Sequence, residues 1–151
     1  GNRYYIEYYQ ESDQNLGNHI QYVQSRPYRY GTHFAPHDIN VRDLTSGISR
    51  ISWAEKEHGF IFEPVKRVVV NEAIPIVQRY MQDCYFDRTK CALGLRALKN
   101  YSQKFNETTN QYLDEPNHDQ WSHGADAFRY GAIGKMDEGG QVFTQGVKGL
   151  Y

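Results

Sequence analysis

This sequence contains few cysteines and carries almost no net charge. Cys84 and Cys91 are its only cysteines, too few for a disulfide framework, so a reducing compartment is favoured. The 17 Lys and Arg residues balance 18 Asp and Glu residues, giving a formal net charge of -1. This balance excludes a polybasic protein whose overall field attracts nucleic acid. Any nucleic-acid contact has to come from a local cluster of cations.

Long apolar runs and nucleotide-binding glycine motifs are also absent. No stretch has the length of apolar residues that a membrane span requires, and the first residues lack the apolar segment of a signal peptide. Neither GxxxxGK[ST] nor GxGxxG occurs, so nucleotide hydrolysis by this chain is not predicted. No Ser-His-Asp or Cys-His pattern stands out either. We therefore expect a soluble intracellular domain that makes no contact with a membrane.

Aromatic residues are plentiful, and their spacing predicts an α/β domain. The sequence has 13 Tyr residues, whose rings can be buried while their hydroxyls stay wet, so a packed core is expected. Ser49 is the predicted N-cap of one helix and Gly59 its stop. The predicted strands span residues 3–10, 30–35 and 60–65, and the predicted helices span 13–25, 50–58, 71–84, 90–105 and 125–133.

This order of elements is typical of a sheet that is at least partly parallel. Three strands make a thin sheet for so many helices, and none is the continuous apolar run of a central strand. The polar segment 106–121 is predicted to be a loop with one short extended piece. We expect one domain over residues 1–134 and a glycine-rich, flexible tail over residues 135–151.

The first candidate for chemistry is Asp38, which follows a predicted strand in the segment APHD. A carboxylate at the C-terminal end of a strand in an open α/β sheet faces the crevice where ligands bind, and it can bind a hard divalent cation. The alternative is that Asp38 caps the turn after Pro36, which is common turn chemistry. Both interpretations stay open on these residues.

The second candidate is the segment 116–130, PNHDQWSHGADAFRY. Ser122 and Asp126 straddle the predicted start of a helix, where the small Gly124 lets another backbone or a ligand come close. Ser122 can act as a cap, and Asp126 is favoured by the field of the helix N-terminus. A purely structural interpretation explains less well why His118, Asp119, His123 and Asp126 occur within nine residues.

Two other patterns have structural and functional interpretations. Cys84, Cys91, His118 and His123 superficially resemble a zinc set, but their spacings do not match those of zinc fingers, and Cys91 lies on the apolar stripe of a predicted helix. The segment from Arg88 to Lys104 holds basic residues and no acidic one. A solvated helix surface explains this, whereas contact with DNA phosphates is the functional interpretation, with the candidates Lys90, Arg96, Lys99 and Lys104.

Taken together and in order, several segments resemble the C-terminal nuclease domain of the large terminase subunit of tailed bacteriophages. The resemblance covers about residues 4–133. Its segments are YYIEYYQES near the start, PHD at 36–38, GISR at 47–50, FD at 86–87, CALGLRALKNY at 91–101 and, above all, PNHDQWSHGADAFRY at 116–130.

This resemblance implies an RNase H-like fold, a mixed sheet flanked by helices, and a metal-dependent endonuclease that cuts concatemeric double-stranded DNA. Two Mg²⁺ or Mn²⁺ ions would orient a water and stabilise charge on the phosphate. By the motif match, Asp38 and Asp126 are the catalytic and metal-binding carboxylates. His37, His118, Asp119 and His123 would support the site, contact DNA or shape the loop.

The chain departs from the family pattern at its beginning. The family's domain starts with a strand that carries the first metal-binding aspartate, and a second strand follows it. The match places this chain's first strand after both, so we expect a fragment with an incomplete sheet, weak metal binding and little cleavage. Its open edge could pair with a second copy of the chain.

The resemblance also implies partners and a location. The partners would be the ATPase domain of the same protein, the small terminase subunit and the portal, in the cytoplasm of an infected or lysogenic bacterium. Two alternatives remain: a non-catalytic module that binds DNA or a packaging partner, and another RNase H-like enzyme such as a resolvase or transposase.

Overall fold

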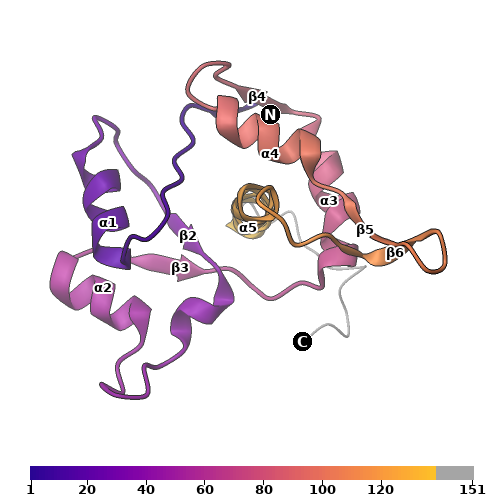
Figure 1. Cartoon of the computed structure of the whole chain (residues 1–151). Helices are drawn as coiled ribbons and strands as arrows, with labels where there is room; N and C mark the ends of the chain where they lie inside the picture. The colour runs from indigo at the N-terminus through magenta and orange to yellow at the C-terminus, as the bar shows by residue number, and fades with distance from the viewer. Residues whose placement is uncertain (139–151) are drawn as a thin grey trace. The chain divides into compact units, whose positions relative to one another are not determined.

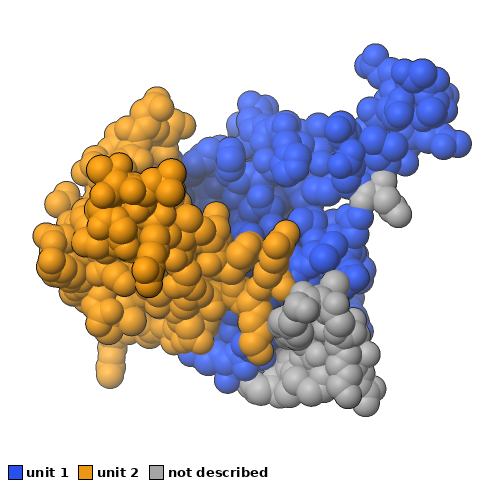
Figure 2. Space-filling model, turned by 90° about the horizontal axis from the view of Figure 1, so that it is seen from below, with its two compact units in different colours: residues 1–10, 68–151 blue, residues 11–67 orange. Residues whose placement is uncertain are grey.

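The computed structural model of the chain describes residues 1–138, which form a mixed α/β structure (Figure 1). The chain divides into two compact units, coloured separately in Figure 2. Unit 1 consists of residues 1–10 and the chain from Val68 onward, and unit 2 consists of residues 11–67. The segment predicted as one domain, residues 1–134, therefore contains all of unit 2 and most of unit 1.

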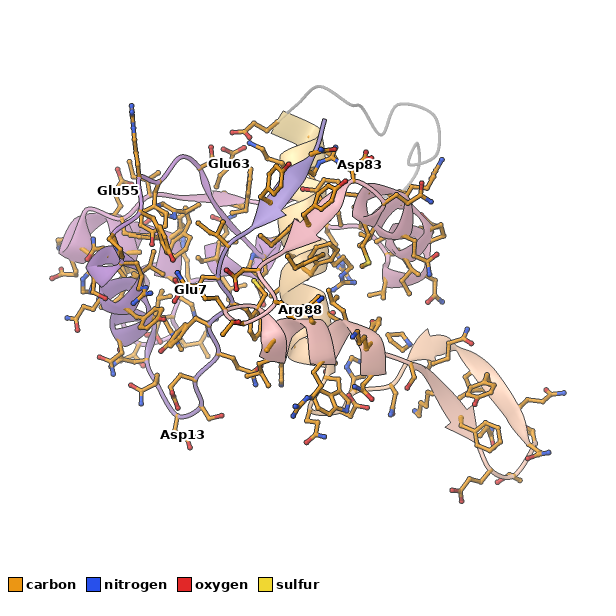
Figure 3. The ribbon with its side chains drawn as sticks, turned by 90° about the horizontal axis from the view of Figure 1, so that it is seen from above. Glu7, Asp13, Glu55, Glu63, Asp83 and Arg88 are labelled. Atoms are coloured by element: carbon orange, nitrogen blue, oxygen red, sulfur yellow. The ribbon has the colours of Figure 1, made fainter. Side chains whose placement is uncertain are left out.

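Unit 1 is built around a parallel pair of short strands. Its elements are β1 (Arg3–Tyr5), α3 (Val70–Met81), β4 (Cys84–Phe86), α4 (Ala92–Asn100), β5 (Gln103–Asn106), β6 (Gln111–Pro116) and α5 (Ser122–Glu138). β1 and β4 pair in register from Arg3 with Cys84 to Tyr5 with Phe86. Arg3 also contacts Asp83, which Figure 3 labels at the start of β4, at 3.4 Å. This ion pair lies at the end of the ribbon, where the amide of Arg3 also donates to the carbonyl of Asp83 at 2.8 Å.

The faces of the β1–β4 ribbon differ because side chains alternate along a strand. Tyr4 and Tyr85 stack on the exposed face, with ring centroids 5.3 Å apart. On the other face Tyr5 and Phe86 stack on each other and contact Phe128 of α5. The buried core of unit 1 continues from Phe128 into Val77, Tyr80 and Ala132.

A hairpin extends from the helices of unit 1 (Figures 1 and 3). β5 and β6 pair antiparallel, with a register shift between Gln103 and Phe105. At its tip the Asn106 side chain accepts hydrogen bonds from the amides of Thr108 and Thr109. Phe105 and Tyr112 contact each other edge to face and remain exposed.

Unit 2 packs two helices beside a second parallel pair of strands. Its elements are α1 (Leu16–Ser25), β2 (His33–Ala35), the 3-10 helix η1 (His37–Asn40), α2 (Arg50–His58) and β3 (Phe62–Pro64). β2 and β3 pair in parallel from His33 with Phe62 to Ala35 with Pro64. The buried core consists of Ile20, Ala54 and Phe60.

The predicted limits of α2 are confirmed. The Ser49 side chain accepts a hydrogen bond from the amide of Ser52, which makes Ser49 the N-cap. Gly59 ends the helix in the left-handed region, with φ of 60°, and its amide bonds to Glu55. The parallel pairing predicted for part of the sheet is also confirmed, twice.

The prediction of one three-stranded sheet is wrong for residues 1–138, which contain three separate two-stranded sheets. Two strands are not predicted because they lie where predicted helices end: β4 begins at residue 84, the last residue of the helix predicted over 71–84, and residues 103–105 of β5 fall inside the helix predicted over 90–105. In the structure the helices end at Met81 and Asn100, and β4 and β5 follow. Strands this short are held mainly by their partners.

The predicted tail begins too early. α5 continues through the predicted boundary at residue 134 to Glu138, because Met136 packs against the core and Lys135 pairs with Glu138 at 2.6 Å. The rest of that predicted tail, residues 139–151, lies outside the described residues. Within residues 1–138, none of the helices combines the length and the apolar character that a membrane crossing requires.

Candidate functional site

Asp126 lies on α5. The loop that precedes this helix is held together by hydrogen bonds to the side chain of Asp119. The amide of Trp121 donates to Oδ1 of Asp119 at 2.9 Å, and the amide group of Asn117 donates to Oδ2 at 3.1 Å. Ser122, the first residue of α5, donates from its hydroxyl to the carbonyl of Asp119. Both carboxylate oxygens of Asp119 are therefore engaged within the loop.

Gly124 brings α5 close to α4. A Cβ on Gly124 would lie 2.7 Å from Cβ of Ala97 and 2.9 Å from the hydroxyl oxygen of Tyr8. The close approach expected at this glycine is thus an approach of α4 and of the Tyr8 ring. This packing fixes the first turn of α5 and, with it, the place of Asp126.

Asp126 forms an ion pair with Arg129, one turn further along α5. Nη2 of Arg129 lies 3.0 Å from Oδ1 of Asp126, with exposed side-chain fractions of 10% for Arg129 and 36% for Asp126. The Arg129 guanidinium also lies over the ring of Tyr130, 5.0 Å from its centroid. Among residues 1–138, the buried Nε of Arg129 has no hydrogen-bond partner.

A cavity of about 160 Å³ adjoins this pair. Asp126, Arg129, Tyr101 and Gln78 supply its polar wall, and apolar side chains of α3, α4 and α5 complete it. Burial raises the pKa of the Tyr101 phenol; the negative charge of Asp126 raises it further, Arg129 opposes this, and Asp119 adds to the rise. The Tyr101 phenol is therefore protonated at neutral pH, as an ordinary tyrosine is, and it lies in the same cavity wall as Asp126.

Asp38 lies in unit 2, three residues after the last residue of β2. It is the second residue of η1, and its backbone carbonyl accepts a hydrogen bond from the amide of Val41 at 3.0 Å. Its side chain is exposed. The structure thus places Asp38 after the C-terminal end of a parallel strand, as the sequence predicts, and inside a short helical turn.

Asp38 belongs to unit 2 and Asp126 to unit 1. Both offer carboxylate oxygens in solvent-accessible positions, which is the donor chemistry that Mg²⁺ and Mn²⁺ prefer. Among the residues that the structure describes, no group of three or more His, Cys, Asp or Glu side chains is arranged to hold a metal ion. The two-metal site remains a prediction.

The other predicted site residues are spread over both units. His37 is half-buried in η1, whereas His118 and His123 are exposed on either side of the start of α5. Of the four basic candidates, Arg96 and Lys99 are neighbours on the exposed surface of α4, and Lys90 precedes that helix. Lys104 lies on β5 and pairs with Glu115 at 3.4 Å.

Arg129 and Tyr101 are the residues that the sequence analysis did not single out. The spacing of Asp126 and Arg129, three residues apart on a predicted helix, indicates that the side chains are neighbours. Burial of Arg129 leaves no such mark in the sequence. Tyr101 falls within the helix predicted over 90–105, but it is the C-cap residue of α4, where the chain turns toward the hairpin.

The chain is similar in sequence to a known phage protein. The chain is 29% identical over 129 residues to the terminase large subunit of Escherichia phage T5. The aligned region covers 85% of this chain and 28% of the phage protein, so the chain spans little more than a quarter of the length of that relative. No family model matches the chain, and no solved structure matches it. The sequence is therefore related to that of a terminase large subunit, as the resemblance predicts.

Proposed function

We propose that this chain is a metal-dependent endonuclease domain of a phage DNA-packaging terminase and that it cuts concatemeric double-stranded DNA. The observation that carries the proposal is the similarity to the T5 terminase large subunit over 129 residues. A terminase relationship by itself fits either a nuclease or an ATPase. The absence of a phosphate-binding glycine loop from the sequence favours the nuclease.

In this proposal Asp38 and Asp126 supply the carboxylates that hold Mg²⁺ or Mn²⁺. Such ions, when bound, lower the pKa of a water and stabilise the charge that develops on the attacked phosphate. Asp119 is a poor candidate for this role because both of its oxygens already accept hydrogen bonds within its loop. Its part is to shape the loop that positions the first turn of α5.

The exposed cations of α4 give the proposed enzyme a contact for DNA. Arg96 and Lys99 are exposed and three residues apart on a helix, so both can reach neighbouring phosphates. Lys104 is less available because Glu115 already neutralises part of its charge. His37, His118 and His123 remain candidates for DNA contacts.

The partners and the location follow from the same proposal. The chain would work beside the ATPase domain of its own polypeptide and with the small terminase subunit and the portal, in the cytoplasm of the bacterial host. Pairing with a second copy through the open edges of the short parallel sheets is part of the proposal as well.

A plasmid assay tests the proposed activity. The chain, expressed alone and within the longest reading frame that encodes it, is incubated with supercoiled DNA and Mn²⁺ or Mg²⁺. We expect the longer protein to nick or linearise the plasmid, the chain alone to cleave it little, and Asp38→Ala and Asp126→Ala in the longer protein each to abolish cleavage. Glu55→Gln in unit 2 and Glu107→Gln in unit 1 are matched controls, because both residues are exposed and acidic and lie outside the proposed site.

Three results contradict the proposal. Cleavage that persists in both aspartate variants would show that Asp38 and Asp126 are not the catalytic carboxylates. Salt-dependent DNA binding without cleavage in either protein identifies a binding module instead. Cleavage that strongly prefers branched junctions or transposon ends over linear duplex identifies a resolvase or a transposase.

A further inference from the structure

Unit 2 carries a row of touching aromatic rings that runs from its surface to its core. The rings of Tyr28 and Tyr30 meet edge to face with centroids 6.3 Å apart, and the Tyr30 centroid lies 5.2 Å from that of His33. His33 in turn stacks on Phe60, with centroids 4.0 Å apart. Phe60 is 6% exposed, whereas Tyr30 keeps 43% of its surface exposed. Packing of the core therefore explains the inner end of this aromatic row but not its outer end.

The outer end of the aromatic row is held on the last turn of α1. The Tyr30 hydroxyl donates to the carbonyl of Val23 at 2.8 Å, and the amide of Arg26 donates to the same carbonyl at 3.1 Å. Pro27 follows Arg26 and restricts the backbone further. The exposed Tyr30 ring is thus fixed before any ligand arrives, so little conformational freedom would be lost on binding.

Two arginines lie among these rings. The Arg26 guanidinium lies over the rings of Tyr22 and Tyr28, at 5.6 and 5.9 Å from their centroids. Arg29 is exposed in the same segment, residues 25–33, which contains no Asp or Glu. Exposed rings beside arginines are the combination that binds single-stranded nucleic acid, because the rings stack on bases and the arginines attract phosphates.

A solvent-open cavity of about 410 Å³ adjoins the aromatic row at His33 and Phe60. Its wall is both apolar and polar, since Ile61 lines it beside Thr32 and Glu63. Glu63, which Figure 3 labels on β3, would repel a phosphate but can accept a hydrogen bond from the amino group of a base. The cavity therefore suits a base and not the sugar-phosphate chain.

We propose that the aromatic row and the adjoining cavity form a binding site for the unpaired bases of single-stranded DNA. In a duplex each base is stacked on its neighbours, so its faces are not available to a protein ring. Bases would stack on Tyr28 and Tyr30, and phosphates would lie near Arg26. Only the choice of DNA rests on the proposed function, because stacking requires neither a metal ion nor cleavage.

The experiment measures the fluorescence anisotropy of a labelled single strand of about 12 nucleotides, within the usual site size, and of the same strand annealed to its complement. The whole chain is used, with a chelator in place of divalent ions, so that cleavage cannot interfere. Tyr28→Leu and Tyr30→Leu remove rings, and Arg26→Gln removes a charge. Tyr112→Leu, on the hairpin of unit 1, and Arg42→Gln, in unit 2, are the matched controls, because both residues are exposed and lie outside the aromatic row.

We expect each ring variant to weaken single-strand binding by roughly 5-fold or more and to leave duplex binding unchanged, because only unpaired bases stack on the rings. Arg26→Gln should reduce the slope of log affinity against log salt by about 0.7 for the single strand. Tyr30→Phe keeps the ring and loses only the hydrogen bond to Val23, so it should bind as the parent chain does. Thermal unfolding shows which variants fold, and Tyr28→Leu decides the question if Tyr30→Leu does not fold.

The outcomes separate this inference from the proposed function. Absence of single-strand binding by the parent chain overturns the inference. Equal weakening of single-strand and duplex binding by the ring variants overturns it too, and so does a loss of binding in Tyr112→Leu as large as theirs. Cleavage by the longer protein without single-strand binding leaves the proposed function intact, and single-strand binding without cleavage leaves this inference intact.

Discussion

Tyr8 occupies the space that a side chain on Gly94 would need: a Cβ on Gly94 would lie 2.8 Å from Cγ of the Tyr8 ring. The same ring reaches Gly124 of α5 with its hydroxyl, so a single aromatic side chain fills the gap that two glycines leave between α4 and α5. The amide of Tyr8 also donates to the carbonyl of Lys90 at 3.2 Å. The segment after β1 is thereby fixed against α4.

We expect Gly94→Ala to destabilise unit 1 by about 1–3 kcal/mol, the usual range for overpacking a tight contact. Gly131→Ala is the matched control, because Gly131 is also helical and a Cβ there would meet nothing within 4 Å. That control should stabilise by about 0.5–1 kcal/mol, since alanine is the better helix former. Denaturant unfolding of both variants checks the prediction, and equal effects would contradict the contact.

Gly59→Ala should destabilise unit 2 by about 1–2 kcal/mol, because alanine pays a steric penalty in the left-handed conformation that ends α2. Gly59 has φ of 60° there, and space for a methyl group is not the limiting factor, since nothing lies within 4 Å of its Cβ position. Gly31→Ala, in open space without a positive φ, should leave stability nearly unchanged. Thermal unfolding midpoints of the two variants measure the difference.

The stability of unit 2 should fall in mild acid because of His33. Partial burial removes water from the His33 imidazole and lowers its pKa below the ordinary value of 6.5. The His33 ring stacks on Phe60, with ring centroids 4.0 Å apart. The unfolded chain then binds more protons than the folded one, so this contribution is present above the ordinary pKa and is lost as the pH falls through it.

The measurement is the denaturant midpoint at about pH 7.5 and about pH 5.5, on either side of the ordinary histidine pKa. We expect His33→Phe to keep the stacked ring and to lose less stability on acidification than the parent chain. An identical pH dependence in the parent and the variant would show that His33 does not contribute.

Asp119→Ala should loosen the loop before α5 and destabilise unit 1 by about 1–3 kcal/mol, because hydrogen bonds to a charged acceptor are lost. Asp119→Asn keeps one acceptor oxygen and should destabilise unit 1 less than Asp119→Ala does. The fluorescence of Trp121, whose amide Asp119 binds at 2.9 Å, reports on the loop directly. Equal effects of the two substitutions would mean that the side-chain hydrogen bonds are unimportant.

DNA binding should depend on α4 more than on the hairpin. Arg96→Gln and Lys99→Gln are each expected to reduce the slope of log affinity against log salt by about 1, since one phosphate contact is lost in each case. Lys104→Gln should reduce it less, because Glu115 already pairs with Lys104. Fluorescence anisotropy with a labelled duplex at several salt concentrations gives these slopes, and an equal reduction in all three variants would contradict the ranking.

Prediction from sequence succeeded where local chemistry is sufficient. Ser49 and Gly59 mark the ends of α2 by residue type alone, and the structure confirms both. β4 was missed because Cys84–Phe86 continues an apolar pattern from α3, and its pairing with β1 depends on residues far away in the sequence. Three-residue strands carry too little periodicity to be separated from a helix end.

The sequence predicts the two candidate aspartates of the site but not the buried arginine beside one of them. Asp38 and Asp126 follow from a motif resemblance, and the structure gives each a definite local setting. Arg129 is present in the quoted motif, yet its burial and its unpartnered Nε depend on the packing of α3, α4 and α5. Packing of this kind is specified by three-dimensional neighbours and not by spacing along the chain.

Unit 1 is discontinuous in the chain, since Gly1–Gln10 joins the segment from Val68 onward while unit 2 is completed between them. During synthesis on a ribosome, Arg3 leaves the exit tunnel long before its partner Cys84 has been made. All the residues of unit 2 are synthesised before β4. We therefore expect unit 2 to fold during synthesis, before β1 can pair with β4. We expect closure of that long loop to be a late step of folding, because contacts between residues far apart in the chain form slowly. Until β1 pairs with β4, the aromatic side chains of β1 would be exposed to chaperones or to aggregation.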